Sequence, residues 1–131
     1  MTAVSPSLWS EPLTRDECQR RLEVASVARV LLSLRGLPAA LPARIELVEA
    51  GHIVISSREN AVLLAARRGD VISVQIDGID SRTRTWSVTG TGIAAAVSLE
   101  DLETPRFKRI AECCATLVIV PLTVVTGQRE H

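Results

Sequence analysis

The sequence predicts a mainly β protein with short helices, folded as one small antiparallel barrel. Roughly five to seven segments rich in valine, isoleucine, leucine and threonine follow one another along the chain. Tight turns separate most of them, and the helical segments between them are too short for the crossovers of a parallel sheet. Strands that are joined in sequence by tight turns fit an antiparallel barrel better than a doubly wound sheet.

The composition indicates one ordinary globular domain. The chain has 131 residues, of which 47% are apolar and 23% charged, and this is enough for one real core and too short for two domains. Its 15 basic and 15 acidic residues cancel, so no overall field favours nucleic acid or an anionic membrane. One Phe, two Trp and no Tyr leave few aromatic platforms for stacking bases. We therefore expect neither nucleic-acid nor membrane partners.

Cysteine usage and the N-terminus favour a cytoplasmic protein. Cys18, Cys113 and Cys114 are odd in number and lack C-x-x-C spacing, so we expect them to be reduced and structural. The N-terminal segment has no basic stretch followed by an apolar core, and no later segment is long enough to span a membrane.

The first helix is predicted directly after an N-terminal arm. Residues 1–13 contain Pro6 and Pro12 among small polar residues, and we expect a flexible arm there, followed by a single domain over residues 14–131. Thr14 and Glu17 have the spacing of a capping box, and apolar residues then recur at helical spacing to about Ala25.

Three antiparallel strands are predicted from Ala28 onward, with breaks at Arg35–Gly36 and Ala50–Gly51. Pro38 and Pro42 cannot donate ladder hydrogen bonds. The middle strand should therefore begin late, lie at an edge or contain a bulge, and its ordered part is expected over residues 43–48.

A second helix is predicted from Glu59 to Arg68, with Gly69 in the place of a left-handed C-terminal cap. The alternating strand VISVQID follows, and then a turn at residues 77–80 in which Asp side chains should bond the local backbone. A long strand should run over about residues 84–97. Its glycines, Gly90 and Gly92, indicate a bulge or a close backbone approach.

The last part of the chain combines helical and strand patterns. Ser98 and Asp101 have capping-box-like spacing, and Pro105 should separate two helical pieces. The segment TLVIVPLTVVTGQ is β-branched throughout and predicts a last strand that bends at Pro121.

Several segments together resemble the pyridoxamine 5'-phosphate oxidase-like family of flavoproteins. LAARRGDVISVQIDGIDSRTRTWSVTGTG resembles the family's central signature, ECQRRL with VARVLLSLRGLPAALP its first helix and hairpin, and TLVIVPLTVVTGQR its closing strand. The resemblance extends from about Thr14 to Gly127. It implies a split antiparallel β-barrel of the FMN-binding type and a homodimer with a groove between its subunits. The groove would bind FMN, or the deazaflavin F420 in some branches, for hydride transfer to an unspecified substrate.

The resemblance also places a phosphate site around the second helix. Typical members carry Arg and then Thr or Ser at the end of the third strand, and a Lys at the helix start. The corresponding positions here are Ser56, Ser57 and Val62, so a hydroxyl is kept while both charges are missing. Arg58, two positions past the missing Arg, is a candidate substitute, and the alternative is a solvated arginine weakly paired near Glu59.

Four further residues correspond to flavin contacts in the family: Arg44, Gln75, Trp86 and Ser87. Arg44 ends the Pro-Ala-Arg segment that replaces the family's Pro-Val-Asn under the flavin ring, and the alternative is an outward residue paired with Glu46. Gln75 could contact a flavin edge across the dimer interface or satisfy backbone groups. Trp86 could flank the ring or belong to the core.

These residues leave three functions open. The first is an FMN- or F420-dependent oxidoreductase, whose catalytic residues the sequence does not assign. The second is a non-catalytic family member that has lost the cofactor and acts as a dimeric binding module. The third is a binder of another small anionic ligand, held by Arg44, Arg82 and Arg84. No metal site is expected, because His52 has no His or Cys partner at ligand spacing.

Overall fold

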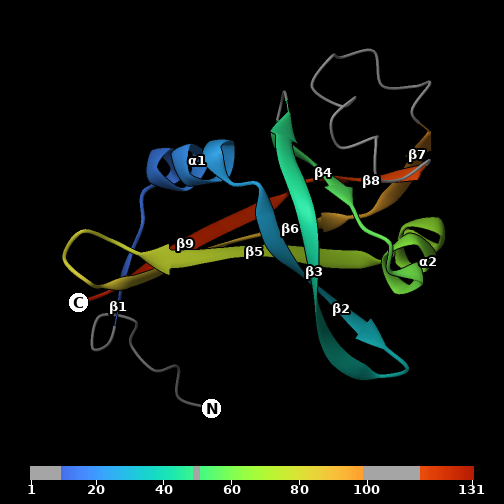
Figure 1. Ribbon diagram of the computed structural model, residues 1–131, viewed down its shortest axis with the longest axis horizontal. Helices are drawn as coiled ribbons and strands as arrows, with labels where there is room; N and C mark the ends of the chain where they lie inside the picture. Colours follow the sequence, from blue (N-terminus) through green and yellow to red (C-terminus); the bar gives the residue numbers. More distant parts are fainter. Residues whose placement is uncertain (1–9, 49–50, 99–115) are drawn as a thin grey trace.

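The computed structural model describes residues 10–48, 51–98 and 116–131 (Figure 1). Strands make up 61% of the described residues, and two short helices accompany them there, which confirms the predicted antiparallel fold of the split-barrel type. The strands are β1 (Ser10–Pro12), β2 (Val27–Leu34), β3 (Leu37–Val48), β4 (His52–Ser56), β5 (Val71–Ile79), β6 (Thr85–Ile93), β7 (Ala95–Ser98), β8 (Thr116–Pro121) and β9 (Val124–Glu130). The helices are α1 (Arg15–Val24) and α2 (Asn60–Arg68).

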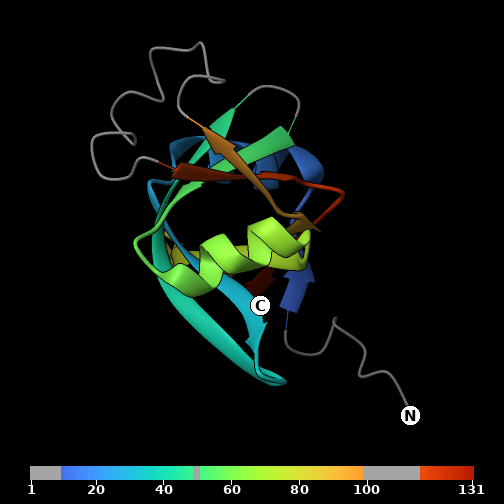
Figure 2. The ribbon, with the colours of Figure 1, turned by 90° about the vertical axis from the view of Figure 1, so that its right-hand side faces the viewer.

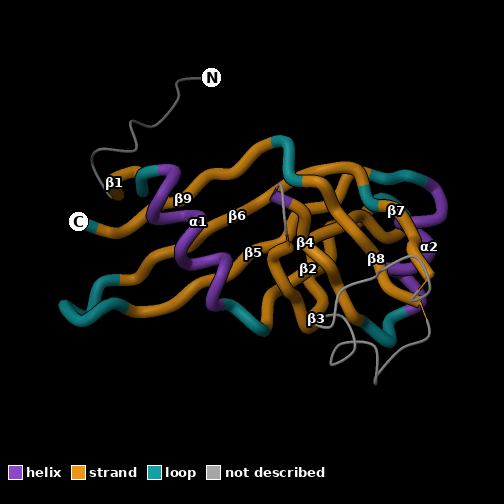
Figure 3. The backbone as a smooth tube through the Cα atoms, turned by 90° about the horizontal axis from the view of Figure 1, so that it is seen from above, coloured by secondary structure: helices purple, strands orange, loops and turns teal. Residues whose placement is uncertain are grey.

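The described strands form one sheet in the order β1-β9-β6-β5-β2-β3-β4-β8-β7, and every pairing is antiparallel. The sheet rolls around its core without closing completely, and α2 lies across one opening (Figure 2). Figure 3 shows the two helices near opposite ends of the rolled sheet. Fully buried side chains from most strands fill the inside: Val30, Ile53, Ile55, Val74, Val88 and Val120.

Both helices begin and end close to the predicted positions. Thr14 caps α1 by accepting a hydrogen bond from the Glu17 N–H at 3.2 Å, and the helix ends at Val24. The side chain of Glu17 contacts Arg129 rather than completing the capping box. Gly69 ends α2 with a φ of 70°, in the left-handed conformation that glycine adopts without strain.

The predicted start of the middle strand was wrong, because β3 begins at Leu37 rather than near Ala43. Ile45 donates its N–H to the carbonyl of Ser26 at 3.0 Å, so the odd-numbered residues of β3 direct their backbone groups toward β2. The backbone groups of Pro38 and Pro42 therefore face the other neighbouring strand, β4, which pairs with β3 only from residue 44 onward. The prolines lie along a local strand edge, where the missing N–H costs no ladder bond.

The turn predicted at residues 77–80 was also misplaced, because β5 continues to Ile79. Gly78 lies opposite Trp86, whose indole ring leaves no room for a Cβ: an added Cβ would lie 2.7 Å from the ring. The reversal instead follows Asp80, whose Oδ1 accepts the backbone N–H groups of Arg82 (2.9 Å) and Arg84 (3.0 Å).

The two glycines of β6 mark the close approach that the sequence predicts. A Cβ at Gly92 would lie 2.0 Å from the Pro121 carbonyl oxygen, and one at Gly90 would meet the Leu122 side chain at 2.8 Å. The long strand expected here divides at Ala94 into β6 and β7, and Pro121 ends β8 at the predicted bend before β9.

Some expectations fall outside the described residues, namely the helical pieces after Ser98 and the states of Cys113 and Cys114. Residues 10–12, expected in the N-terminal arm, pair as β1 with β9. Among the described residues no helix is long and apolar enough to cross a membrane.

Candidate functional site

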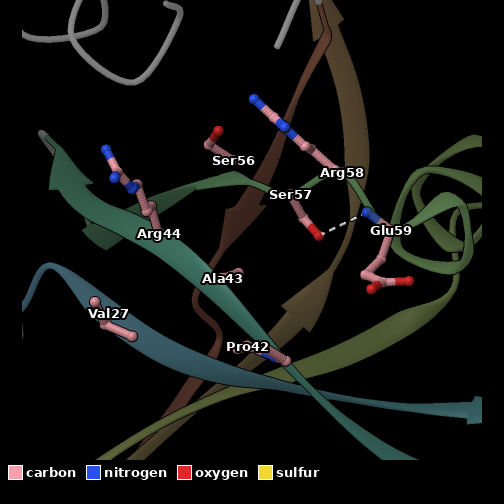
Figure 4. A pocket seen from close by; sticks show the side chains of 8 residues that line it. All are labelled: Val27, Pro42, Ala43, Arg44, Ser56, Ser57, Arg58 and Glu59. Carbon is pink, nitrogen blue, oxygen red and sulfur yellow. Dashed lines mark hydrogen bonds between the residues drawn. The ribbon is translucent and has the colours of Figure 1, made fainter. Parts of the chain in front are cut away.

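A pocket of about 400 Å³ opens where β3 and β4 separate in front of α2 (Figure 4). The pairing of these strands ends at Arg44 and Ser56, after which the chain from β4 turns toward the helix. On the β3 side Pro42 follows with no N–H to offer a partner strand. The lining residues are Val27, Pro42, Ala43, Arg44, Ser56, Ser57, Arg58 and Glu59.

Two arginines give the pocket a positive character. Figure 4 shows Ser56 between Arg44 and Arg58, with both guanidinium groups on the same side of the pocket and Glu59 directed away from them. Within the described part of the chain, neither guanidinium has an ion-pair partner. Guanidinium groups bind carboxylate and phosphate through paired hydrogen bonds. The arrangement is therefore suited to an anion.

The start of α2 adds polar groups to the same place. Ser57 Oγ accepts the backbone N–H of Glu59 at 3.1 Å, which turns the chain into the helix. The first N–H groups of a helix have no partner within the helix. A helix N-terminus favours negative charge. The donors present thus fit a phosphate group.

The remaining predicted residues lie elsewhere. Val62 is only 1% exposed and packs in the core from α2. Gln75 lies on β5 and donates from Nε2 to Thr89 Oγ1 at 3.2 Å, and Ser87 lies on β6 opposite Asp77. Trp86 packs against the core, with the Arg21 guanidinium 4.0 Å from its ring centroid. The single chain therefore brings Arg44, Ser56, Ser57 and Arg58 together and leaves the other four outside the pocket.

Arg84 and Arg82 belong to a different part of the molecule. Arg84 binds Asp80 through Nε at 3.1 Å and lies 3.8 Å from Glu11, while Arg129 binds Glu11 (3.3 Å) and Glu17 (3.0 Å). This network joins the β5–β6 turn, β1, α1 and β9. The anion site proposed from Arg44, Arg82 and Arg84 is therefore not assembled within one chain.

Two titratable groups outside the pocket have shifted pKa values. Partial burial opposes ionisation of Asp80, but the N–H groups of Arg84 and Arg82 and the Arg84 charge outweigh it and lower the pKa of this carboxyl. Burial, with the nearby Glu17 charge, raises the pKa of the Cys18 thiol, which makes it a poor nucleophile. No group of three or more potential metal ligands occurs among the described residues.

Comparison with known proteins gives the family. The profile of the pyridoxamine 5'-phosphate oxidase family matches residues 14–113. This chain belongs to that family. No curated protein matches it at a significant level.

Solved structures share the fold of this family member over nearly its whole length. An FAD-binding protein from Mesorhizobium loti has a TM-score of 0.74 at 19% identity, covering 93% of this chain and 97% of that one. An FAD-binding protein from Mycobacterium smegmatis has a TM-score of 0.66 at 21% identity, with coverage of 92% and 97%. An FAD- and haem-binding protein from the same organism has a TM-score of 0.66 at 17% identity, with coverage of 93% and 73%.

Sequence reasoning on this pyridoxamine 5'-phosphate oxidase family member missed two lining residues, Val27 and Glu59, and placed Pro42 and Ala43 only as part of the segment under the flavin ring. The apolar/polar alternation of β2 places Val27 outward, and the cap position of α2 places Glu59 beside the pocket. The position of Val62 could have been predicted from the sequence, because Val62, Ala65 and Ala66 have the spacing of one buried helix face.

Proposed function

We propose that this protein is a flavin-dependent oxidoreductase that holds the cofactor phosphate in the pocket before α2. The observation that carries the proposal is the pair of guanidinium groups of Arg44 and Arg58, which flank a helix start without an acidic partner in the described chain. Membership of the pyridoxamine 5'-phosphate oxidase family supports a flavin as the anionic ligand. Arg44, Arg58 and Ser57 would hold the phosphate.

The cofactor is FMN in this proposal, and F420 is the alternative from the family resemblance. The three similar structures described above bind FAD, and one of them also binds haem, which adds FAD to the ligands for testing. FMN, FAD and F420 all carry phosphate, and charge-assisted hydrogen bonds are the strongest contacts that a protein makes to phosphate. The bound ring would supply hydride transfer, and the protein would supply binding and orientation.

The proposed active form is a homodimer. One face of the sheet carries apolar side chains that stay exposed in the single chain: Val27 (64%), Val71 (63%), Ile93 (58%) and Val124 (55%). An exposed apolar surface of this kind is typical of an interface. A second copy on this face would also place Gln75 and Ser87 at the interface, because they lie on the same side of β5 and β6.

A second candidate is a family member that binds no flavin. Ser56 and Val62 stand where typical members have charged residues, and the burial of Val62 excludes a simple exchange for Lys at that position, because an ammonium group would be buried. In this case the pocket would bind a different small anion through the same arginines.

The test is the absorbance spectrum of freshly purified protein, followed by titration with FMN, FAD and F420. Arg44→Ala and Arg58→Ala should each weaken flavin binding about five- to tenfold, since each removes one charge-assisted contact in a solvent-exposed site. Arg68→Ala, at the other end of α2, is the matched control and should bind as the wild type does.

A colourless protein without saturable binding of any of the three cofactors would refute the flavin proposal. Flavin binding that survives in both arginine variants would instead place the phosphate outside this pocket.

A further inference from the structure

An ion pair lies on the outer sheet surface beside the pocket. Arg29 on β2 contacts Asp77 on β5, with side chains 54% and 49% exposed. In the single chain such exposed pairs contribute little to stability. The pair also lies on the sheet face proposed for the dimer interface, because Arg29 is opposite Gln75 and Asp77 is opposite Ser87. The position of the Arg29–Asp77 pair next to the proposed cofactor site indicates a role at that site rather than in stabilising the fold.

Strand register connects this pair with the pocket. Val27 lies opposite Arg44, and Arg29 lies opposite Pro42. Side chains two residues apart on a strand point to the same face, about 7 Å from one another. Arg29 is thus the next outward residue after Val27 and the direct neighbour of Pro42, and both of these line the pocket.

The β5 side of Arg29 is polar as well. Gln75 lies directly opposite Arg29, and its amide is held by Thr89. Asp77 is the next outward residue on β5 and therefore a diagonal neighbour of Arg29. The surface runs from the arginines of the pocket over Pro42 and Val27 to a second polar cluster, Arg29, Asp77 and Gln75.

We propose that Arg29, balanced by Asp77, is a positioning residue that would lie beside the bound flavin ring and stabilise its reduced form. The inference rests on the proposed function. Two-electron reduction of the ring with uptake of one proton leaves one negative charge along the N1–C2=O edge, and a nearby cation favours this state. Asp77 offsets part of the Arg29 charge and holds the guanidinium in place.

The experiment is a reductive titration of the full chain loaded with FMN. Dithionite is the reductant, a reference dye reports the midpoint potential, and the pH is chosen so that the reduced ring is anionic. Arg29→Gln should weaken binding of reduced FMN about tenfold more than binding of oxidised FMN, which lowers the midpoint by about 30 mV. Asp77→Asn should shift the midpoint upward, because it leaves the Arg29 charge uncompensated.

Controls separate this role from a structural one. Arg29→Lys keeps the charge and should retain most of the wild-type potential. Arg84→Gln removes an ion-paired arginine from the β5–β6 turn and should leave the potential unchanged. Circular dichroism of each variant checks that it is folded.

The outcomes are distinct. Opposite shifts in Arg29→Gln and Asp77→Asn support the inference. Unchanged potentials, or shifts of the same sign in both variants, would overturn it while leaving flavin binding by the wild type in place. If the wild type binds none of FMN, FAD and F420 in the preceding titration, the proposed function fails first and this inference fails with it.

Discussion

Substitution of Gly92 by Ala tests how the rolled sheet meets itself. Gly92 lies near the end of β6, where the backbone of Pro121 at the end of β8 passes close by. The added Cβ would lie 2.0 Å from the Pro121 carbonyl oxygen and 3.1 Å from Val120 Cγ1. The first contact is with backbone, so β6 and β8 would have to move apart by about 1 Å, and overpacking of this kind costs about 3 kcal/mol.

Gly90→Ala is the matched control, two residues earlier on the same face of β6. Its Cβ would meet Leu122 Cδ1 at 2.8 Å, and this side chain can rotate away at a cost of about 0.5–1.5 kcal/mol. The smaller unfolded-state entropy of Ala offsets about 0.5–1 kcal/mol of that cost. We therefore expect Gly90→Ala to be close to neutral.

Urea unfolding followed by circular dichroism measures both variants. With a denaturant dependence of about 1–3 kcal/mol per molar urea, Gly92→Ala should lower the midpoint by about 1–3 M, and Gly90→Ala by much less. A midpoint for Gly92→Ala equal to or above that of Gly90→Ala would refute the argument, because it would mean that the two strand ends are not in fixed contact.

Three further predictions follow from the described contacts. The lowered pKa of Asp80 means that its stabilising effect is complete above the ordinary aspartate pKa of about 4 and is lost as the pH falls through the lower folded value. The urea midpoints of wild type and Asp80→Asn should therefore converge as the pH falls below about 4, and a gap that stays constant would contradict this. Ile93→Glu places a charge on the exposed face of β6 and should convert the proposed dimer to monomers in sedimentation, whereas Leu64→Glu, on exposed α2 surface, should not; dimers in both variants would exclude this face as the interface. Arg21→Gln removes the cation over the Trp86 ring and should lower the free energy of unfolding by about 0.5–1 kcal/mol. An unchanged free energy of unfolding would mean that Arg21 does not stack on Trp86 in solution.

Local sequence signals predicted the parts of the fold that depend on local chemistry. Thr14 and Gly69 set helix ends through contacts within a few residues, so the sequence contains the whole cause. The start of β3 depends instead on which side of Pro42 is unpaired, and that depends on where β4 leaves the sheet. Gly78 likewise lies in a strand, where the Trp86 ring packs against it and leaves no room for a Cβ. Only the pairing of β5 with β6 brings these two residues together.

The candidate site was predictable to a similar extent. The resemblance located Ser56 to Arg58 and Arg44, and strand pairing explains why these distant segments meet. Val62 was assigned to the site from its correspondence to a family position, although helical spacing places it in the core. The relation of Arg29 to the pocket requires the register of three strands, which no local pattern contains.

The two prolines of β3 also affect how the protein behaves at high concentration. Between residues 38 and 43 the outer side of this strand has no described partner, and Ala40 holds the single N–H between the two proline nitrogens on that side. An incoming strand from another molecule would find acceptors without enough donors, so polymerisation through this edge is disfavoured. The barrel can therefore keep the entrance to its pocket open without turning that opening into a nucleus for aggregation.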